Sequence, residues 1–175
     1  MQLLQSTEPS KLDGGAIIAS MIKASVEIVV AVPDITTSAG LLWPVSKREE
    51  FQLVRVCKED EGISICAALA LCKRRSVLMM QQTGLFDSLN AVRGIAVEYK
   101  QPVCMLVGLL GKEPGVPPHM NKKYSVRTVV PILKAMEVPY LCIEENQDIG
   151  QISAAIDRAY ETSSPLVVLF GRRIG

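Results

Sequence analysis

The stretch that decides the fold spans residues 59–70 and runs Glu59-Asp60-Glu61-Gly62-Ile63-Ser64-Ile65-Cys66-Ala67-Ala68-Leu69-Ala70. Three acidic residues stand here between an apolar segment (51–57), typical of a buried strand, and a segment rich in small residues (62–72), typical of a helix. In an open α/β sheet, ligands bind in the crevice at the carboxyl ends of such strands. The three acids are therefore expected at a ligand-binding edge, although acids also stabilise a helix start through the helix dipole.

Apolar strand-like segments and helix-like segments alternate on both sides of this stretch. Strands are expected at 27–32, 51–57, 76–81, 102–108, 140–143 and 166–170. Helices are expected at 12–24, 38–43, 62–72, 87–99, 125–136 and 149–162, which leaves 109–124 as one long loop. The alternation predicts a three-layer α/β/α fold with a six-stranded parallel sheet and right-handed crossovers. The chain has 175 residues, and we expect all of it (1–175) to form a single domain.

Composition narrows the classes of function. Hydrophobic residues make up 49% of the chain and aromatic residues 5%, which suits an aliphatic core around buried parallel strands. The formal net charge is +1 and the only three-residue basic run is Lys73-Arg74-Arg75, so no nucleic acid partner is expected. The amino terminus lacks a signal-peptide pattern and no apolar run approaches the ~18 residues of a membrane span, so we expect a cytoplasmic protein without a membrane partner.

Several common sites do not fit the sequence. The five cysteines lie in apolar segments without CxxC spacing and the chain has a single histidine, so we expect reduced, buried thiols and no metal ligands in this chain. The first expected strand leads into residues 32–38 without the GxGxxG of a dinucleotide-binding fold. Neither a GxxxxGK phosphate loop nor a GxSxG nucleophile turn occurs.

Two motifs resemble the pyrimidine-binding domain of thiamine diphosphate-dependent decarboxylases. The first is Glu59-x-Glu61-Gly62-Ile63-Ser64-Ile65-Cys66-Ala67-Ala68, and the second is Met79-Met80-Gln81-Gln82-Thr83-Gly84-Leu85-x-x-Ser88-Leu89-Asn90-Ala91. The pattern is most similar to the sulfopyruvate and phosphonopyruvate decarboxylases, which the Val32-Pro33-Asp34 turn and the segment 111–119 also resemble. The similarity spans most of the chain.

The resemblance implies that Glu59 is the catalytic residue that activates the cofactor. In that family a glutamate accepts a hydrogen bond from N1′ of the aminopyrimidine ring, so that the ring can act as the base. Asp60 and Glu61 remain alternatives, as does a plain role for all three acids at a helix start. The family turn after the third strand implies four further cofactor-binding residues: Gln82, Thr83, Gly84 and Leu85.

The same resemblance implies that Asp34 and His119 face the substrate. A lone acid after a proline is more often a turn or cap residue, and a lone histidine in a loop is usually solvated. The family arginine after the fourth strand is replaced here by Leu109-Leu110-Gly111, which puts a sulfonate or phosphonate substrate in doubt. The nearby cations that could compensate are Lys112, Lys122, Lys123 and Arg127.

The implied protein is one subunit of a two-component enzyme. The GDG motif that holds Mg²⁺ and the diphosphate in this family is absent from the chain. Thiamine diphosphate and Mg²⁺ would therefore be held mainly by a separate beta-type subunit, and the pair would decarboxylate a 2-oxo acid such as sulfopyruvate or phosphonopyruvate to an aldehyde. Other possibilities are a homodimer of the isolated chain, a noncatalytic assembly or regulatory domain, and a flavodoxin-like binder of a small ligand.

Overall fold

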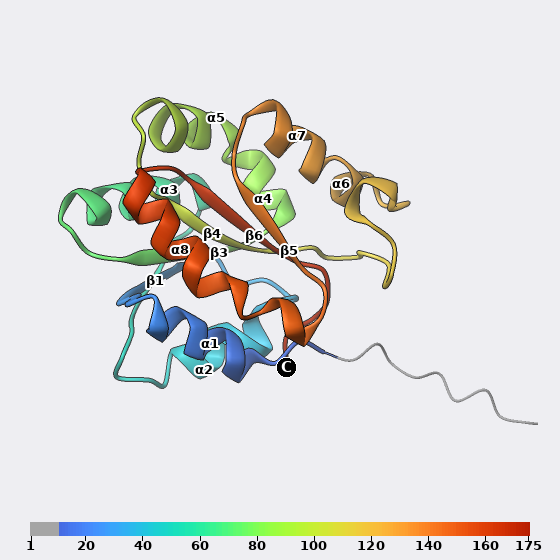
Figure 1. Cartoon of the computed structure of the whole chain (residues 1–175), viewed down its shortest axis with the longest axis horizontal. Coiled ribbons are helices and arrows are strands. Elements are labelled where there is room, and N and C mark those ends of the chain that lie inside the picture. Colours follow the sequence, from blue (N-terminus) through green and yellow to red (C-terminus); the bar gives the residue numbers. More distant parts are fainter. Residues whose placement is uncertain (1–10) are drawn as a thin grey trace, which may run out of the picture.

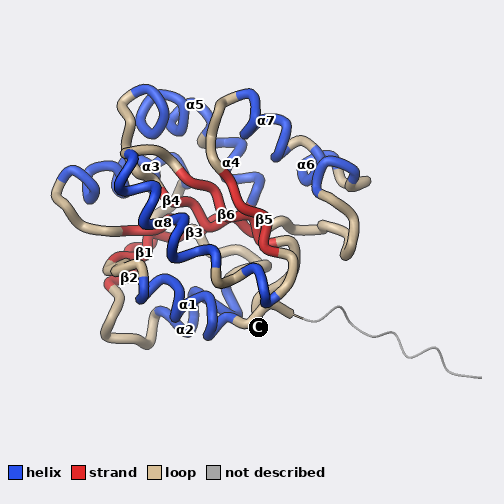
Figure 2. The backbone as a smooth tube through the Cα atoms, viewed as in Figure 1, coloured by secondary structure: helices blue, strands red, loops and turns tan. Residues whose placement is uncertain are grey.

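A six-stranded parallel sheet forms the centre of the computed structural model, which describes residues 11–175 (Figure 2). The strand order is β2-β1-β3-β4-β6-β5. The strands are β1 (Ile28–Ala31), β2 (Gln52–Arg55), β3 (Ser76–Gln81), β4 (Cys104–Gly108), β5 (Tyr140–Ile143) and β6 (Leu166–Phe170). Every pair of neighbours is parallel, so all the carboxyl ends meet at one edge of the sheet.

Helices cover both faces of this sheet, which confirms the predicted three-layer α/β/α fold (Figure 1). One face carries α1, α2 and α8, and the other carries α3 to α7. The α-helices are α1 (Gly14–Lys23), α2 (Trp43–Val45), α3 (Glu59–Leu71), α4 (Gln82–Asp87), α5 (Leu89–Ala91), α6 (Tyr124–Arg127), α7 (Val129–Ala135) and α8 (Gln151–Thr162). Two π-helices, η1 (Ser38–Leu42) and η2 (Val92–Glu98), and two 3₁₀-helices, η3 (Pro118–Met120) and η4 (Asn146–Asp148), complete the described elements.

Two separate apolar cores explain why the inner strands are apolar at every position. Side chains alternate across a strand, so Val29 and Ala31 pack with the α1 and α8 layer while Ile28 and Val30 pack with the α3 layer. All four residues of β1 are buried. Within residues 11–175, every helix is too short or too polar for a membrane span.

Two helix starts differ from the sequence prediction. Helix α3 begins at Glu59 rather than at residue 62, so the three acids form its first turn. Helix α4 begins at Gln82, directly after β3, whereas the sequence placed a turn at 83–84 and a helix only from 87. A glycine next to a threonine is an ordinary turn signal, and the packing of α4 overrides it here.

The cysteines are free, but only some are buried as expected. Cys66 and Cys104 are 0% exposed, while Cys57 and Cys72 are exposed at the surface, which corrects the expectation of five buried thiols. Burial raises the pKa of Cys66 to about 11, and burial also raises the pKa of Cys104. The thiolate is the reactive form, so these two thiols are doubly protected from modification.

Thiol labelling checks this difference. We expect Cys57 and Cys72 of the native chain to react with iodoacetamide at pH 8, and Cys66 and Cys104 to react only after unfolding in urea. Peptide mass spectrometry at successive times gives the order. Labelling of Cys66 as fast as Cys72 in the folded protein would contradict the buried position of α3 against the sheet.

Candidate functional site

The side chain of Glu59 lies across the backbone of Gly84. A methyl group built on Gly84 would stand 2.0 Å from Oε1 of Glu59 and 2.5 Å from its Cγ. The two residues come from different elements, since Glu59 opens α3 after β2 and Gly84 lies in α4 after β3. The structure therefore brings the two central sequence motifs together at the carboxyl edge of the sheet, with the half-buried carboxylate of Glu59 between them.

The other two acids of the cluster are engaged at the start of α3. Oε2 of Glu61 accepts hydrogen bonds from the backbone N–H groups of Cys57 (3.1 Å) and Lys58 (3.3 Å), as in a capping box. Oδ1 of Asp60 accepts from the N–H of Glu61 at 2.9 Å. Of the three acids, Glu59 is the one placed against α4. That Glu59 rather than Asp60 or Glu61 activates a cofactor stays a prediction from the resemblance.

Lys58 joins the start of α3 to the end of α4 and was missed in the sequence. Its Nζ lies 3.4 Å from Oδ2 of Asp87, at the end of α4, and 3.8 Å from Oδ2 of Asp60. The hydrogen bond to Asp87 and the charge of Asp60 raise the pKa of Lys58. A cation directly before an acidic cluster was the available signal, but the pairing with Asp87 depends on the tertiary contact of α3 with α4.

The remaining residues of the predicted cofactor turn point in different directions. The amide of Gln82 is fully buried and pairs with the backbone of Leu110, accepting from its N–H at 2.9 Å and donating to its carbonyl at 3.0 Å. Leu85 is 1% exposed and packs in the core, whereas Thr83 is exposed. Gln82 therefore anchors the loop after β4, while Gly84 presents bare backbone to Glu59.

Asp34 has the turn-capping geometry that was its alternative interpretation. Its Oδ1 accepts from the N–H groups of Thr36 (2.6 Å) and Thr37 (3.1 Å), and its Oδ2 accepts from the hydroxyl of Thr37. Oδ1 would also lie 3.0 Å from a methyl group on Gly108, at the end of β4. The carboxylate thus stands at the same sheet edge as Glu59, with its oxygens already used by the turn.

His119 stands apart from these contacts. It is exposed in η3, which packs against α6 and α7, and within residues 11–175 no hydrogen bond or ion pair involves it. The structure therefore does not bring His119 into contact with Glu59 or Asp34. Its proposed role toward substrate stays a prediction.

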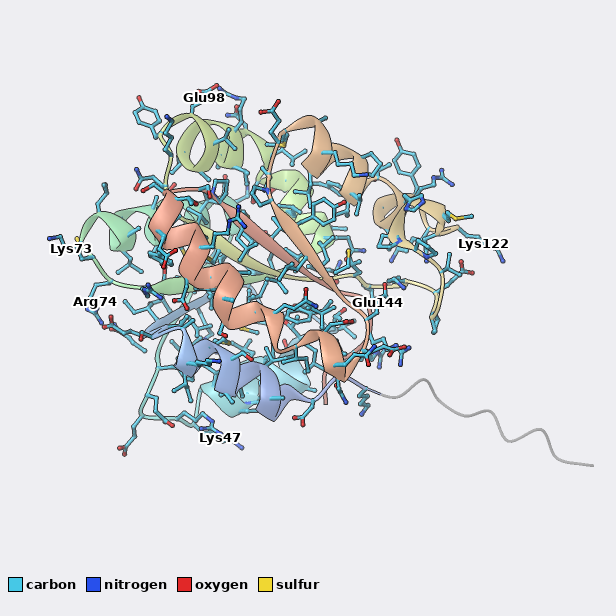
Figure 3. The ribbon with its side chains drawn as sticks, in the orientation of Figure 1. Lys47, Lys73, Arg74, Glu98, Lys122 and Glu144 are labelled. Atoms are coloured by element: carbon cyan, nitrogen blue, oxygen red, sulfur yellow. The ribbon has the colours of Figure 1, made fainter. Side chains whose placement is uncertain are left out.

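A cavity of about 570 Å³ opens beside the loop after β4, and Lys112 forms part of its wall. The side chain of Lys112 is fully buried, and its Nζ donates to Oε2 of Glu144 at 2.7 Å and to the carbonyl of Glu113 at 3.0 Å. Glu144 in turn lies across Gly171, where a methyl group would be 2.8 Å from Oε1. Figure 3 shows Glu144 at the carboxyl edge, beyond the ends of β5 and β6.

The other cations near this loop also have partners. Nζ of Lys123 donates to the carbonyl of Leu110 at 2.7 Å, and Lys122 pairs with Glu113 at 3.6 Å on the surface. The guanidinium of Arg127 stacks on the ring of Tyr124. Among the four cations that the sequence offered as replacements for the missing arginine, only Lys112 lines the cavity.

Replacing Gly84 by alanine tests the contact with Glu59. We expect Gly84→Ala to lower the free energy of unfolding by about 1–3 kcal/mol, because the added methyl group overlaps the Glu59 side chain. In a Glu59→Ala background the overlapping atoms are gone, and the same change should be neutral or stabilising by up to about 1 kcal/mol, as glycine-to-alanine changes in helices are. Urea unfolding of the four proteins measures both effects. Equal effects in the two backgrounds would show that the contact is absent.

A second variant tests the buried ion pair. Lys112→Met should lower the free energy of unfolding by about 1–3 kcal/mol, less than for a fully buried pair, because water reaches the carboxylate that is left behind at Glu144. The matched control is Lys122→Met, whose exposed pair with Glu113 should contribute less than about 0.5 kcal/mol. Chemical denaturation of both variants gives the comparison, and equal losses would mean that Lys112 is solvated.

Comparison with known proteins supports the resemblance seen in the motifs. No protein-family model matches the chain. The alpha subunit of sulfopyruvate decarboxylase from Methanococcus maripaludis is 25% identical over 132 residues, which cover 71% of this chain and 73% of that subunit. The alpha subunit of sulfopyruvate decarboxylase from Methanothermobacter thermautotrophicus is 26% identical over 159 residues, which cover 88% of this chain and 92% of that subunit.

A longer relative and a solved structure match only in part of their length. Sulfopyruvate decarboxylase from Methanosarcina acetivorans is 25% identical over 133 residues, and the match covers 32% of that protein. The structure of 2-oxoglutarate:ferredoxin oxidoreductase from Magnetococcus marinus superposes with a TM-score of 0.68 at 16% identity, covering 92% of this chain and 29% of that one, which supports the fold. The chain is thus similar over most of its length to sulfopyruvate decarboxylase alpha subunits, as its motifs predicted.

Proposed function

We propose that this chain is the pyrimidine-binding subunit of a two-component, thiamine diphosphate-dependent decarboxylase of 2-oxo acids. The observation that carries the proposal is the carboxylate of Glu59 held against the bare backbone of Gly84. The relatives named as subunits of sulfopyruvate decarboxylase support a decarboxylase subunit. The substrate class is a 2-oxo acid with an acidic substituent, such as sulfopyruvate or phosphonopyruvate, and the products are an aldehyde and CO₂.

The residues at the sheet edge fit an aminopyrimidine ring. Glycine has no side chain, so a flat ring can approach the backbone of Gly84 closely. Glu59 would accept the hydrogen bond from N1′ and hold or return a proton at its carboxylate, as a general acid and base. When bound, the cofactor supplies an electron sink for the electron pair left as CO₂ departs. Thr83 is exposed in α4 and is proposed to border the ring, whereas the buried Leu85 is proposed to support α4 from the core side.

The diphosphate and Mg²⁺ are assigned to a beta-type partner subunit in this proposal. Mg²⁺ requires several oxygen ligands in near-octahedral array. Residues 11–175 hold no group of three or more His, Cys, Asp or Glu side chains placed for a metal ion, and the GDG motif is absent from the sequence. The Methanosarcina relative supports the assignment, because about two thirds of that protein lies outside the matched part.

The test is Glu59→Gln in the complex reconstituted with its beta-type partner. We expect decarboxylation of sulfopyruvate to fall by about 100-fold or more, because an amide cannot exchange a proton with the ring. The matched control is Glu61→Gln, whose amide oxygen can still accept the two capping hydrogen bonds, so stability should change by less than about 1 kcal/mol and turnover should stay intact. Initial rates of CO₂ release, with circular dichroism as a check on folding, give the result.

Two outcomes would overturn parts of the proposal. Near-wild-type turnover of Glu59→Gln together with an inactive Glu61→Gln would move the role to Glu61. A noncatalytic assembly domain predicts two other results. The partner would bind thiamine diphosphate equally well with and without this chain, and the complex would decarboxylate no 2-oxo acid.

A further inference from the structure

The cavity beside the loop after β4 is lined by positive charge. The described residues that line it include Lys11, Lys112, Arg172 and Arg173 and no acidic residue. The chain as a whole is nearly balanced, with 19 basic and 18 acidic residues. Four cations around about 570 Å³ are therefore a local concentration, at the edge where an α/β sheet binds its ligands.

Among the described residues, part of this charge has no acid within ion-pair distance, although Glu145 lines the adjoining hollow together with Lys11 and Arg172. Lys112 is paired with Glu144 inside the wall. Within residues 11–175, by contrast, no ion pair involves Lys11 or Arg173, and Arg173 is exposed. Like charges held together in a hollow repel one another, so an anion placed between them would be attracted strongly.

The wall also holds a buried hydroxyl group without a partner. Thr36 is 2% exposed and lines the cavity, and among the described residues its Oγ1 has no hydrogen-bond partner. Leaving a buried hydroxyl without a hydrogen bond is unfavourable, so a donor in this position favours an acceptor supplied by a ligand. A hydroxyl and two cations that line one cavity are a suitable set of donors for a negatively charged oxygen.

The cavity wall is held in place by backbone hydrogen bonds. The N–H of Ile174 donates to the carbonyl of Thr36 at 3.1 Å, and the N–H of Leu12 donates to the carbonyl of Arg173 at 2.9 Å. The carboxyl-terminal segment 171–175 is thereby tied to the turn after β1 and to the start of α1. The backbone that carries Thr36, Arg173 and Lys11 is therefore fixed before any ligand arrives, which reduces part of the cost of binding.

We propose that this cavity is an oxyanion site that takes a tetrahedral anionic group, such as a sulfonate or phosphonate. The identity of the ligand rests on the proposed function: the group would be the acidic substituent of the 2-oxo acid. Free inorganic sulfate or phosphate offers the same chemistry and would be the alternative source. Arg173, Lys11 and Thr36 then replace the arginine that the sequence lacks after the fourth strand.

The position of the cavity suits this role. Gly84 follows β3, and the cavity wall follows β4 and β6, the next two strands of the sheet. Both places lie at the carboxyl edge of the sheet, with Gly84 on the α3–α7 face and the wall segments 11–12 and 171–174 on the α1 face. Asp34 and Thr36, from the turn after β1, both lie against Gly108 at the end of β4. A small molecule with an acidic tail could therefore approach both.

The first experiment measures binding of sodium sulfate to the full chain by titration calorimetry, with sodium chloride at matched ionic strength as the blank. We expect saturable binding that weakens about tenfold or more in Arg173→Gln, because hydrogen bonds to a charged group are among the stronger ones. Thr36→Val should also weaken binding, while its free energy of unfolding stays the same or rises, since the hydroxyl has no partner to lose.

The matched control is Lys73→Gln, which removes the same charge from the far end of the molecule (Figure 3). It should bind sulfate as the wild type does. Equal weakening by Lys73→Gln and Arg173→Gln would indicate general charge attraction and would overturn the site. So would unchanged affinity in both Arg173→Gln and Thr36→Val.

The second experiment uses the complex with its beta-type partner and identifies the source of the anion. If the site holds the substrate's acidic substituent, Arg173→Gln should raise KM for sulfopyruvate about tenfold and leave kcat/KM for pyruvate, which lacks that substituent, unchanged. If sulfate changes the rate of sulfopyruvate decarboxylation but does not compete with sulfopyruvate, the site binds a free anion instead.

The two proposals can fail separately. A complex that decarboxylates no 2-oxo acid, while sulfate binding still depends on Arg173, would overturn the proposed function and support the oxyanion site. The oxyanion site alone would be overturned by two results together: the chain binds no sulfate, and the complex decarboxylates sulfopyruvate with the same KM in the wild type and in Arg173→Gln.

Discussion

The packing of one carboxylate against one glycine sets the arrangement of the whole sheet edge. The Glu59 side chain occupies the space that a methyl group on Gly84 would need, so α3 and α4 can approach only because position 84 has no side chain. The first turn of α3 uses Glu61 as its cap and leaves Glu59 facing α4. Lys58, between Asp60 and Asp87, closes the same contact from outside. The three neighbouring acids are therefore placed differently by packing: Glu59 faces α4, whereas Asp60 and Glu61 accept hydrogen bonds from backbone N–H groups at the start of α3.

A second carboxylate repeats this packing with a different outcome. Glu144 lies across Gly171 after β6 as Glu59 lies across Gly84 after β3, but Glu144 is paired with the buried Nζ of Lys112. No ion pair within residues 11–175 involves Glu59. A paired carboxylate has its charge satisfied inside the protein and serves structure, whereas an unpaired one can interact with a ligand. The same local geometry thus separates a structural acid from one available for chemistry.

The sequence was sufficient for the parts of the fold that depend on local pattern. The apolar runs 140–143 and 166–170 coincide with β5 and β6. β6 is buried at every position and is apolar throughout, whereas the edge strand β5 is apolar although three of its four residues are only half-buried. The start of α4 was not predictable, since the local signal at 83–84 indicates a turn. Within the candidate site, the resemblance pointed to Glu59 and Gly84, which lie in contact in the structure. An acid after a proline is usually a turn residue, and Asp34 has that geometry. The positive wall of the cavity, with Thr36 and Arg173, joins segments far apart in the sequence, and no local pattern predicts such a meeting.

The sheet edge divides its chemistry between its two halves, and this division bears on why a second chain would be needed. An acid stands at the end of β3 and cations stand beyond β4 and β6, so a ligand with a basic ring and an acidic tail would be oriented along the edge. In this chain, however, the carboxylate of Glu59 is only half-buried and Arg173 is exposed, so water weakens both interactions. A subunit placed over this edge would exclude that water and strengthen both at once. The proposed partner would therefore complete the electrostatics of the site as well as supply the ligands for a diphosphate.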